Sequence, residues 1–264
     1  MRKNQESEGC EGFKKNVIFV KTHKTASSSV QNILLRYTVN HGLNLAMPRH
    51  NGARFFNPEP FSPDMVRPFY DEDEQPNVIA NHLVASPELF NFIPDAFTFT
   101  ILRSVPSLYE STFEYFKTST KAFKNAGNID AFYSNPKEFY APGSHYNEYT
   151  RNHMAHDLGF KQDSVDPVYF QKSVEYMERR FDLVLISDYF LESMILLQDR
   201  LCLTMDEVVT LVVNARDKNR LYRQQQLKIS SAGILSIFIY STISTQLSGS
   251  SWRQFLTYKN AKKT

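Results

Sequence analysis

The sequence predicts an α/β fold in which a mostly parallel central sheet is flanked by helices. Four short apolar segments have the pattern of buried strands: VIFV (17–20), NVIA (77–80), FTFTIL (97–102) and FDLVLIS (181–187). The first, third and fourth of these segments run into stretches with helical periodicity. Strands that alternate with helices favour a parallel sheet, because each parallel connection needs a crossover segment.

The three expected helices differ in the regularity of their apolar faces. The helix after residues 17–20 is the clearest, and the helix after residues 97–102 is less regular. The apolar positions at helical spacing are Val30, Ile33, Leu34 and Tyr37, then Val105, Leu108, Tyr109, Phe113 and Phe116, and finally Leu191, Met194, Ile195 and Leu201. Thr204 and Glu207 then have the spacing of a capping box, which predicts the start of a further helix.

The length of 264 residues and the hydrophobic fraction of 42% suit one domain, which we place at residues 15–264. Residues 1–14 are expected to form an N-terminal extension without fixed structure. Residues 218–264 belong to a Gln-, Ser- and Thr-rich stretch whose structure the pattern does not predict. Segment 43–76 is predicted to be a long surface excursion, and segment 118–150 to combine loop with short helices.

Composition excludes several classes of protein. The 30 basic and 28 acidic side chains give a net charge of +2, so we expect no nucleic-acid partner, and any anion site must be local. The sequence has no run of about 20 apolar residues that could span a bilayer. Cys10 and Cys202 lack the spacing of a zinc site, and the sequence leaves open whether they form a disulfide.

The turn KTHKTASSS (21–29), between the first strand and its helix, has the composition of an anion site. The first N–H groups of a helix have no intrahelical partner, and the helix dipole favours negative charge beside them. Small side chains allow close approach of a ligand, and Lys24 supplies a full positive charge. Ala26 raises a question of backbone strain, because a positive φ at this position would be unfavourable for alanine and would lower the stability of the fold.

This turn differs from the phosphate loop of nucleotide triphosphatases. Such a loop needs the pattern GxxxxGK[ST], whereas the turn has no glycine and its lysines precede the small residues. An ATP-dependent kinase is therefore disfavoured, also because no magnesium-binding carboxylate stands beside the turn. The alternative without a ligand is that the serines only cap the helix.

A second candidate anion site follows the third strand. In LRSVPSLYES, Arg103 stands at the strand end and Ser111 lies eight positions later on the expected helix. An arginine fork with a nearby hydroxyl can hold a phosphate group. The carboxyl ends of parallel strands meet at one edge of the sheet, so this pair is expected near the first turn.

Together these segments resemble the galactose 3-O-sulfotransferase family, which includes the galactosylceramide sulfotransferases. The resemblance covers about residues 15–217 in the order of the family. It rests on VIFVKTHKTASSSVQNILLRY, NHLV, ILRSVPSLYESTFEYF, RNHMAHDLGF, FDLVLISDYFLESMILLQDRLC and NAR. The resemblance implies the P-loop-like sulfotransferase fold, which agrees with the strand pattern.

The resemblance also implies the sulfate donor 3′-phosphoadenosine 5′-phosphosulfate (PAPS), with 3′-phosphoadenosine 5′-phosphate (PAP) as its product and no required metal. The residues it assigns to the 5′-phosphosulfate are Lys21, Thr22, His23, Lys24, Thr25, Ala26, Ser27 and Ser28. Those it assigns to the 3′-phosphate are Arg103 and Ser111.

Sulfuryl transfer needs charge stabilisation on the leaving oxygen and a base for the acceptor hydroxyl. We expect Lys24 to supply the charge. For the base we expect His82, which follows the second strand and whose usual pKa near 6.5 suits proton abstraction. His23 is the alternative base, or it orients the sulfate, and a structural role of His82 in a loop is the alternative without catalysis.

Other polar residues receive a structural interpretation. His145, His153 and His156 form no HExxH pattern and have no neighbouring cysteine, so no metal site is expected. Asp188, at the end of the fourth strand, is expected to cap the helix that follows it.

The acceptor site is expected in segments 43–76 and 118–150. Aromatic residues that could contact a sugar, none of which is assigned to the site, are Phe113, Tyr115, Phe116, Tyr146 and Tyr149. By resemblance the acceptor is a terminal β-galactose of a glycolipid or glycoprotein, sulfated at its 3-hydroxyl. Location in the Golgi apparatus, with membrane association, is likewise implied by resemblance only. A relative that binds PAPS or a sulfated glycan without turnover is the alternative function.

Overall fold

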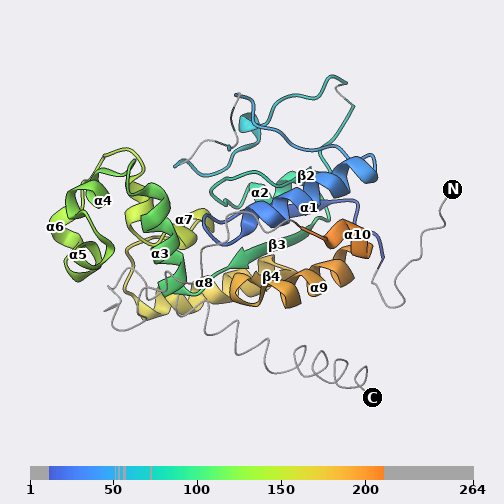
Figure 1. The fold of residues 1–264 in the computed structure, drawn as a ribbon. Helices are drawn as coiled ribbons and strands as arrows, with labels where there is room; N and C mark the ends of the chain where they lie inside the picture. Colours follow the sequence, from blue (N-terminus) through green and yellow to red (C-terminus); the bar gives the residue numbers. More distant parts are fainter. Residues whose placement is uncertain (1–11, 51, 53, 56–57, 72, 211–264) are drawn as a thin grey trace, which may run out of the picture.

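The computed structural model describes residues 12–210 apart from residues 51, 53, 56, 57 and 72. At its centre lies a four-stranded, all-parallel sheet in the order β2-β1-β3-β4 (Figure 1). The strands are β1 (Val17–Val20), β2 (Val78–Ile79), β3 (Phe97–Leu102) and β4 (Leu183–Ile186). Each of them lies within one of the four predicted segments, so the α/β prediction is confirmed.

The central strand β1 is buried on both faces. Val17 and Phe19 belong to one hydrophobic cluster, whereas Ile18 and Val20 belong to another on the opposite face. Side chains alternate between the faces of a strand, and a sheet covered on both faces therefore needs apolar residues at every position. This explains why VIFV is a continuous apolar run.

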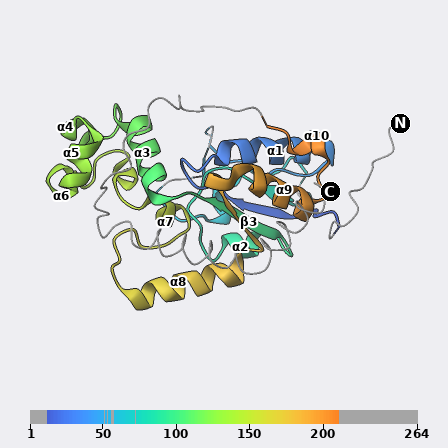
Figure 2. The ribbon, with the colours of Figure 1, turned by 60° about the horizontal axis from the view of Figure 1, so that its bottom comes forward.

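Helices cover the two faces of the sheet. The predicted helices α1 (Ser27–Asn40) and α9 (Phe190–Leu201) pack on the Val17 and Phe19 face. The opposite face is covered by α8 (Pro167–Arg180), α2 (Leu89–Phe92) and α7 (His153–Asp157). Figure 2 shows α1 and α9 on one side of β3 and α8 on the other.

A separate group of short helices extends from one end of the sheet. It begins with α3 (Val105–Phe116), the predicted helix after β3, and continues with α4 (Lys121–Ala126), α5 (Ile129–Ser134), α6 (Pro136–Phe139) and the 3₁₀ helix η2 (Asn147–Thr150). These helices enclose a small aromatic cluster of their own, which includes Phe113, Phe123, Phe132 and Tyr149. Figure 1 shows α4, α5 and α6 as a lobe beside α3.

Segment 43–76 runs along the outside of β2 and contributes one short 3₁₀ helix, η1 (Pro63–Met65). Isolated parallel bridges join Leu45 to Val78 and Arg54 to His82. Phe55 and Phe61 from this segment are buried against the core. The excursion is therefore anchored to the sheet edge, close to the residues that follow β2.

A second 3₁₀ helix, η3 (Ser187–Tyr189), lies between β4 and α9. The last helix of the described chain is α10 (Met205–Val208). The capping box of Thr204 and Glu207 is present at the start of α10. Cys202 is disulfide-bonded, and Cys10, the other cysteine of the chain, lies outside the described residues. Most of the expected N-terminal extension and all of segment 218–264 also lie outside them. Within the described residues, none of the helices has the length and hydrophobicity needed to cross a membrane.

Candidate active site

A cleft of about 600 Å³ lies at the carboxyl ends of the four strands. Parallel sheets bind ligands at this edge, because the loops after each strand converge there. Nine of the predicted site residues line the cleft: Lys21, His23, Lys24, Ala26, Ser27, Ser28, His82, Arg103 and Ser111. Residues that are 90 positions apart in the sequence are thus brought to a single site.

The N-terminus of α1 opens into this cleft. Ala26 is its N-cap residue, and Ser27, Ser28 and Ser29 of its first turn line the cleft. No acidic side chain stands in the first turn of the helix, so no carboxylate of that turn offsets its positive dipole end. The arrangement favours binding of an anion with phosphate-like geometry.

The turn before α1 is strained at two positions. Lys24 and Ala26 both have φ of 62°, in the left-handed region that favours glycine. The question raised by the sequence at Ala26 is thereby answered, because the position does need a positive φ. The turn holds this conformation at a cost to the free energy of folding.

We expect Ala26→Gly to raise the free energy of unfolding by about 0.5–1 kcal/mol, because relief of the strain outweighs the added freedom of the unfolded chain. Ala131→Gly is the matched control. Because Ala131 lies within α5, this variant should lower the free energy of unfolding by about 1 kcal/mol. Urea unfolding of both variants measures the effect. A loss of stability in both would show that Ala26 is not strained.

Thr22 and Thr25 do not line the cleft, in contrast to the expectation from sequence. Both are fully buried beneath the turn. The Thr22 hydroxyl donates to the Ile101 carbonyl oxygen at 2.5 Å, and the two threonine hydroxyls lie 2.8 Å apart. Their side chains are used to fix the turn to β3, so they shape the site without facing a ligand.

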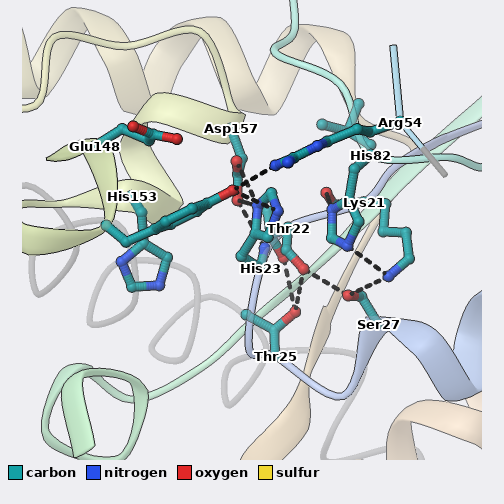
Figure 3. Close-up of polar contacts among 12 residues, drawn as sticks. Lys21, Thr22, His23, Thr25, Ser27, Arg54, His82, Glu148, His153 and Asp157 are labelled. Carbon is teal, nitrogen blue, oxygen red and sulfur yellow. Dashed lines mark hydrogen bonds and ion pairs between the residues drawn. The ribbon is translucent and has the colours of Figure 1, made fainter. Parts of the chain in front are cut away.

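Lys21 lies deep in the cleft and is 2% exposed. Its ammonium donates to Ser27 Oγ at 3.3 Å and to His82 Nε2 at 3.0 Å (Figure 3). It also donates to Ser28 Oγ at 3.2 Å. Burial, with the nearby Lys24 charge, lowers the pKa of Lys21 to about 8, while Asp157 opposes this shift. An anion in the cleft would compete for this ammonium and stabilise its charged form.

The contacts of His82 define its tautomer. Its Nδ1 is 3.1 Å from the Lys21 carbonyl oxygen, which can only accept, so Nδ1 carries the proton. Its Nε2 faces the Lys21 ammonium, which can only donate, so Nε2 holds a lone pair. Burial, together with His23 and Lys21, lowers the pKa of His82 well below its usual range. His82 is therefore neutral, with its basic nitrogen in the cleft.

Lys24 and Arg103 meet at the opposite wall of the cleft. Arg103 Nη1 donates to the Lys24 carbonyl oxygen at 2.8 Å, which holds the strained residue in place. The Lys24 ammonium lies 3.7 Å from the centroid of the Tyr115 ring, a cation–π contact. The two predicted anion sites are thus in direct contact, and Ser111 lines the same cleft.

After β4, Ser187 and Asp188 of η3 and Phe190, the first residue of α9, line the cleft. Asp188 accepts hydrogen bonds from the Ser104 backbone N–H at 2.8 Å and from its hydroxyl at 2.6 Å. It therefore caps α3 and not, as expected, the helix that follows β4. Ser187 Oγ is buried and has no hydrogen-bond partner among the described residues, so a ligand in the cleft could supply one.

The sequence did not single out Asp157, which is fully buried behind the cleft. Its carboxylate accepts from the His23 backbone N–H at 2.6 Å and lies 2.9 Å from His23 Nδ1 (Figure 3). Burial raises the pKa of Asp157 to about 7 and lowers that of His23 to about 3. Asp157 does not follow a strand, so the rule that identified the other residues could not find it.

The remaining histidines do not gather into a metal site. His153 is fully buried and its Nε2 lies 3.1 Å from the Thr112 hydroxyl. Among the residues that the structure describes, no group of three or more histidine, cysteine or acidic side chains is placed to hold a metal ion.

Comparison with known proteins shows the family of this chain. The family model described as Galactose-3-O-sulfotransferase matches residues 5–258. Galactose-3-O-sulfotransferase 2 of Mus musculus is 38% identical over an alignment of 211 positions that covers 77% of this chain and 54% of that protein. Galactosylceramide sulfotransferase of Mus musculus is 32% identical over an alignment of 266 positions that covers 95% of this chain and 60% of that protein.

Galactose-3-O-sulfotransferase 3 of Mus musculus is 35% identical over an alignment of 208 positions that covers 76% of this chain and 48% of that protein. The chain spans about half the length of the curated relatives it matches. The cleft at the strand ends, the basic strand-to-helix turn and a family match over most of the sequence agree with one another. The chain therefore belongs to the galactose-3-O-sulfotransferase family.

Proposed function

We propose that this chain binds PAPS in the cleft and transfers its sulfuryl group to the 3-hydroxyl of a terminal β-galactose on a glycolipid or glycoprotein. The observation that carries the proposal is the convergence of three cations, Lys21, Lys24 and Arg103, on a cleft that also holds the N-terminus of α1 and the neutral His82. The names of the relatives support the galactose acceptor.

The donor site has two parts. The N-terminus of α1, with Ser27 and Ser28, would hold the 5′-phosphosulfate, and Lys24 would neutralise the charge that develops on the leaving oxygen. Arg103 and Ser111 would hold the 3′-phosphate from the α3 side of the cleft. PAPS carries two anionic groups, and the basic and hydroxyl side chains from two walls of one cleft would bind one group each.

The reaction follows from these positions. The acceptor oxygen forms a bond to sulfur as the bond between sulfur and the bridging phosphate oxygen breaks, and the electron pair leaves on PAP. The acceptor proton moves to His82 Nε2. In the ligand-free protein this nitrogen accepts from Lys21. A bound anion would draw Lys21 away, which frees the base and raises its pKa.

The acceptor would enter beside His82, where segment 43–76 meets the loop before α7. Arg54, bridged to His82 through the backbone, donates to the hydroxyl groups of Tyr146 and Tyr149 on that side. Tyr115 is 65% exposed at the cleft and offers an aromatic face to a sugar ring. Phe113 and Tyr149, by contrast, are core residues.

We also propose that the protein works in the Golgi lumen in association with the membrane. The disulfide at Cys202 supports an oxidising compartment, because disulfides persist outside the reducing cytosol.

The direct test is a sulfate-transfer assay with labelled PAPS. Purified chain is incubated with β-galactosides, including galactosylceramide and N-acetyllactosamine, and with matched α-galactosides and glucosides. We expect transfer to β-galactosides only, at the 3-hydroxyl as read from the product by NMR. Binding of PAP without transfer to any sugar would favour the alternative, a relative that binds PAPS without turnover.

The pH dependence of donor binding tests the position of Lys21. Its pKa is about 8 in the free protein, and an anionic ligand raises it. PAP affinity should therefore be highest below pH 8 and should fall by up to about tenfold for each unit above it. Calorimetry at pH 8.5 in buffers of different ionisation enthalpy should show proton uptake in the wild type and none in Lys21→Met. Equal heats in all buffers for the wild type would mean that no proton is taken up on PAP binding, and Lys21 would then not be part of the donor site.

A further inference from the structure

The Asp157 carboxylate contacts His23, a residue that lines the cleft. Asp157 is the last residue of α7, is completely buried and directs its carboxylate at both the backbone and the side chain of His23. No lysine or arginine forms an ion pair with Asp157 among the described residues, where His23 is its only salt-bridge partner. Its hydrogen bonds are thus to the backbone and imidazole of His23, while His153, His156 and Lys21 are the other titratable groups that act on the carboxyl.

The contacts of His23 Nε2 fix which partner donates in the hydrogen bonds around the His23 ring. Tyr149 hydroxyl lies 3.0 Å from His23 Nε2, and Arg54 Nη1 donates to the same hydroxyl at 3.4 Å. We assign the Tyr149 proton to His23 Nε2, because the guanidinium can only donate. His23 then carries its own proton on Nδ1, facing Asp157. The chain of donors runs from Arg54 through Tyr149 and His23 to the buried carboxylate.

The ring of His23 lies flat against the ring of His82. Their centroids are 3.8 Å apart and the ring planes differ by 12°. The edge of His82 is held by the Lys21 carbonyl oxygen at Nδ1, and its backbone carbonyl accepts from the Phe55 N–H at 2.8 Å. One face of the expected base is thus covered by a ring whose orientation depends on Asp157.

We propose that Asp157 is a positioning residue for His82: it fixes the orientation and tautomer of His23, and the stacked His23 ring holds His82 Nε2 toward the acceptor. This inference rests on the proposed function, in which His82 is the base. A displacement of about 1 Å at a reacting group can cost about 100-fold in rate, so a rigid platform beside the base has a large effect on turnover.

The free energy of unfolding of the Asp157→Asn variant separates a positioning role from a purely structural one. Burial raises the pKa of Asp157 to about 7, so its folded pKa lies above the unfolded value. Its contribution to stability is then greatest below the unfolded pKa and is lost as the pH rises through about 7. A neutral amide of the same shape avoids this loss. Asparagine at position 157 should therefore leave the fold at pH 8 as stable as before, or more stable.

Asp157→Asn is the decisive variant. Its amide group faces His23 Nδ1, which must then accept, so the His23 proton moves to Nε2. We expect kcat to fall by about 10- to 100-fold, with a smaller change in PAP affinity and in the donor KM, because loss of the Asp157 charge also lowers the pKa of Lys21. The ¹⁵N shifts of His23 should report the change of tautomer. Tyr149→Phe, which removes the donor to Nε2, should give a smaller fall in kcat.

Two controls separate positioning from general damage. Asp163→Asn makes the same chemical change at an exposed ion pair with Arg151 and should leave kcat unchanged. In a His82→Ala background, Asp157→Asn should cause no further loss, because it acts through the missing ring. A full additional loss in that background, or an unchanged kcat in Asp157→Asn, would overturn the positioning role. Loss of PAP binding together with a lower Tm would overturn it in favour of a structural role.

The outcome also distinguishes this inference from the proposed function. A wild-type chain that transfers sulfate while Asp157→Asn transfers it equally well would overturn the positioning role alone. A wild-type chain that binds PAP but transfers no sulfate to any galactoside would overturn both.

Discussion

Replacement of His82 by alanine is expected to lower kcat for sulfate transfer by about 10²- to 10⁴-fold, the usual contribution of a general base. PAP affinity should stay equal or become tighter, because Lys21 loses the partner that competes with the donor. Steady-state transfer assays and PAP calorimetry on the same variant measure both effects. Lost turnover with intact donor binding would show that His82 acts after the donor has bound.

His41→Ala is the matched control for this variant. His41 caps the far end of α1 and pairs with Glu207, so its loss should leave kcat unchanged. If His82→Ala retained full kcat, the base would have to be another group. The stacked His23 would be the first alternative, and His23→Ala would then carry the loss.

Replacement of Lys24 by alanine is expected to lower kcat by about 10²- to 10³-fold, with a smaller change in the donor KM. The reason is that its charge is needed most when negative charge develops on the leaving oxygen, so its effect belongs to the transition state. Initial rates over a range of PAPS concentrations separate kcat from KM.

Lys117→Ala provides the comparison, because Lys117 directly follows α3 and pairs with the nearby Glu114. It should change neither constant. A higher donor KM with an unchanged kcat in Lys24→Ala would show that Lys24 only binds the donor. Its contact with the Tyr115 ring would then mark a resting position outside the reaction.

Local sequence patterns predicted much of this fold. The run VIFV has no polar residue because both faces of β1 are covered, and short apolar-rich runs likewise located β3, which also holds two buried threonines, and β4. The site could be predicted for a related reason. Parallel strands end at one edge, so Lys21, His82 and Arg103 had to meet there once the strands were identified.

Long-range contacts were not predictable from the same patterns. Asp157 lies on a short helix, and only the folded chain brings it to His23, 134 positions earlier. Asp188 has the spacing of a cap for its own helix, yet it binds Ser104 across the sheet edge. Thr22 has the chemistry of a ligand contact, but a turn bent at two positive φ angles places its hydroxyl against Ile101. In each case tertiary geometry decided between roles that the sequence allowed equally.

The most direct test of the account is the affinity of the cleft for PAP. Calorimetry would compare PAP with adenosine 5′-monophosphate, which lacks only the 3′-phosphate, and with ATP, and would repeat the series with Arg103→Ala. We predict micromolar binding of PAP, much weaker binding of the other two nucleotides, and a loss of about 10- to 100-fold for PAP alone in the variant. Equal affinity for the three nucleotides, or no binding of PAP by the wild-type chain, would contradict the proposal that this cleft holds a sulfate donor.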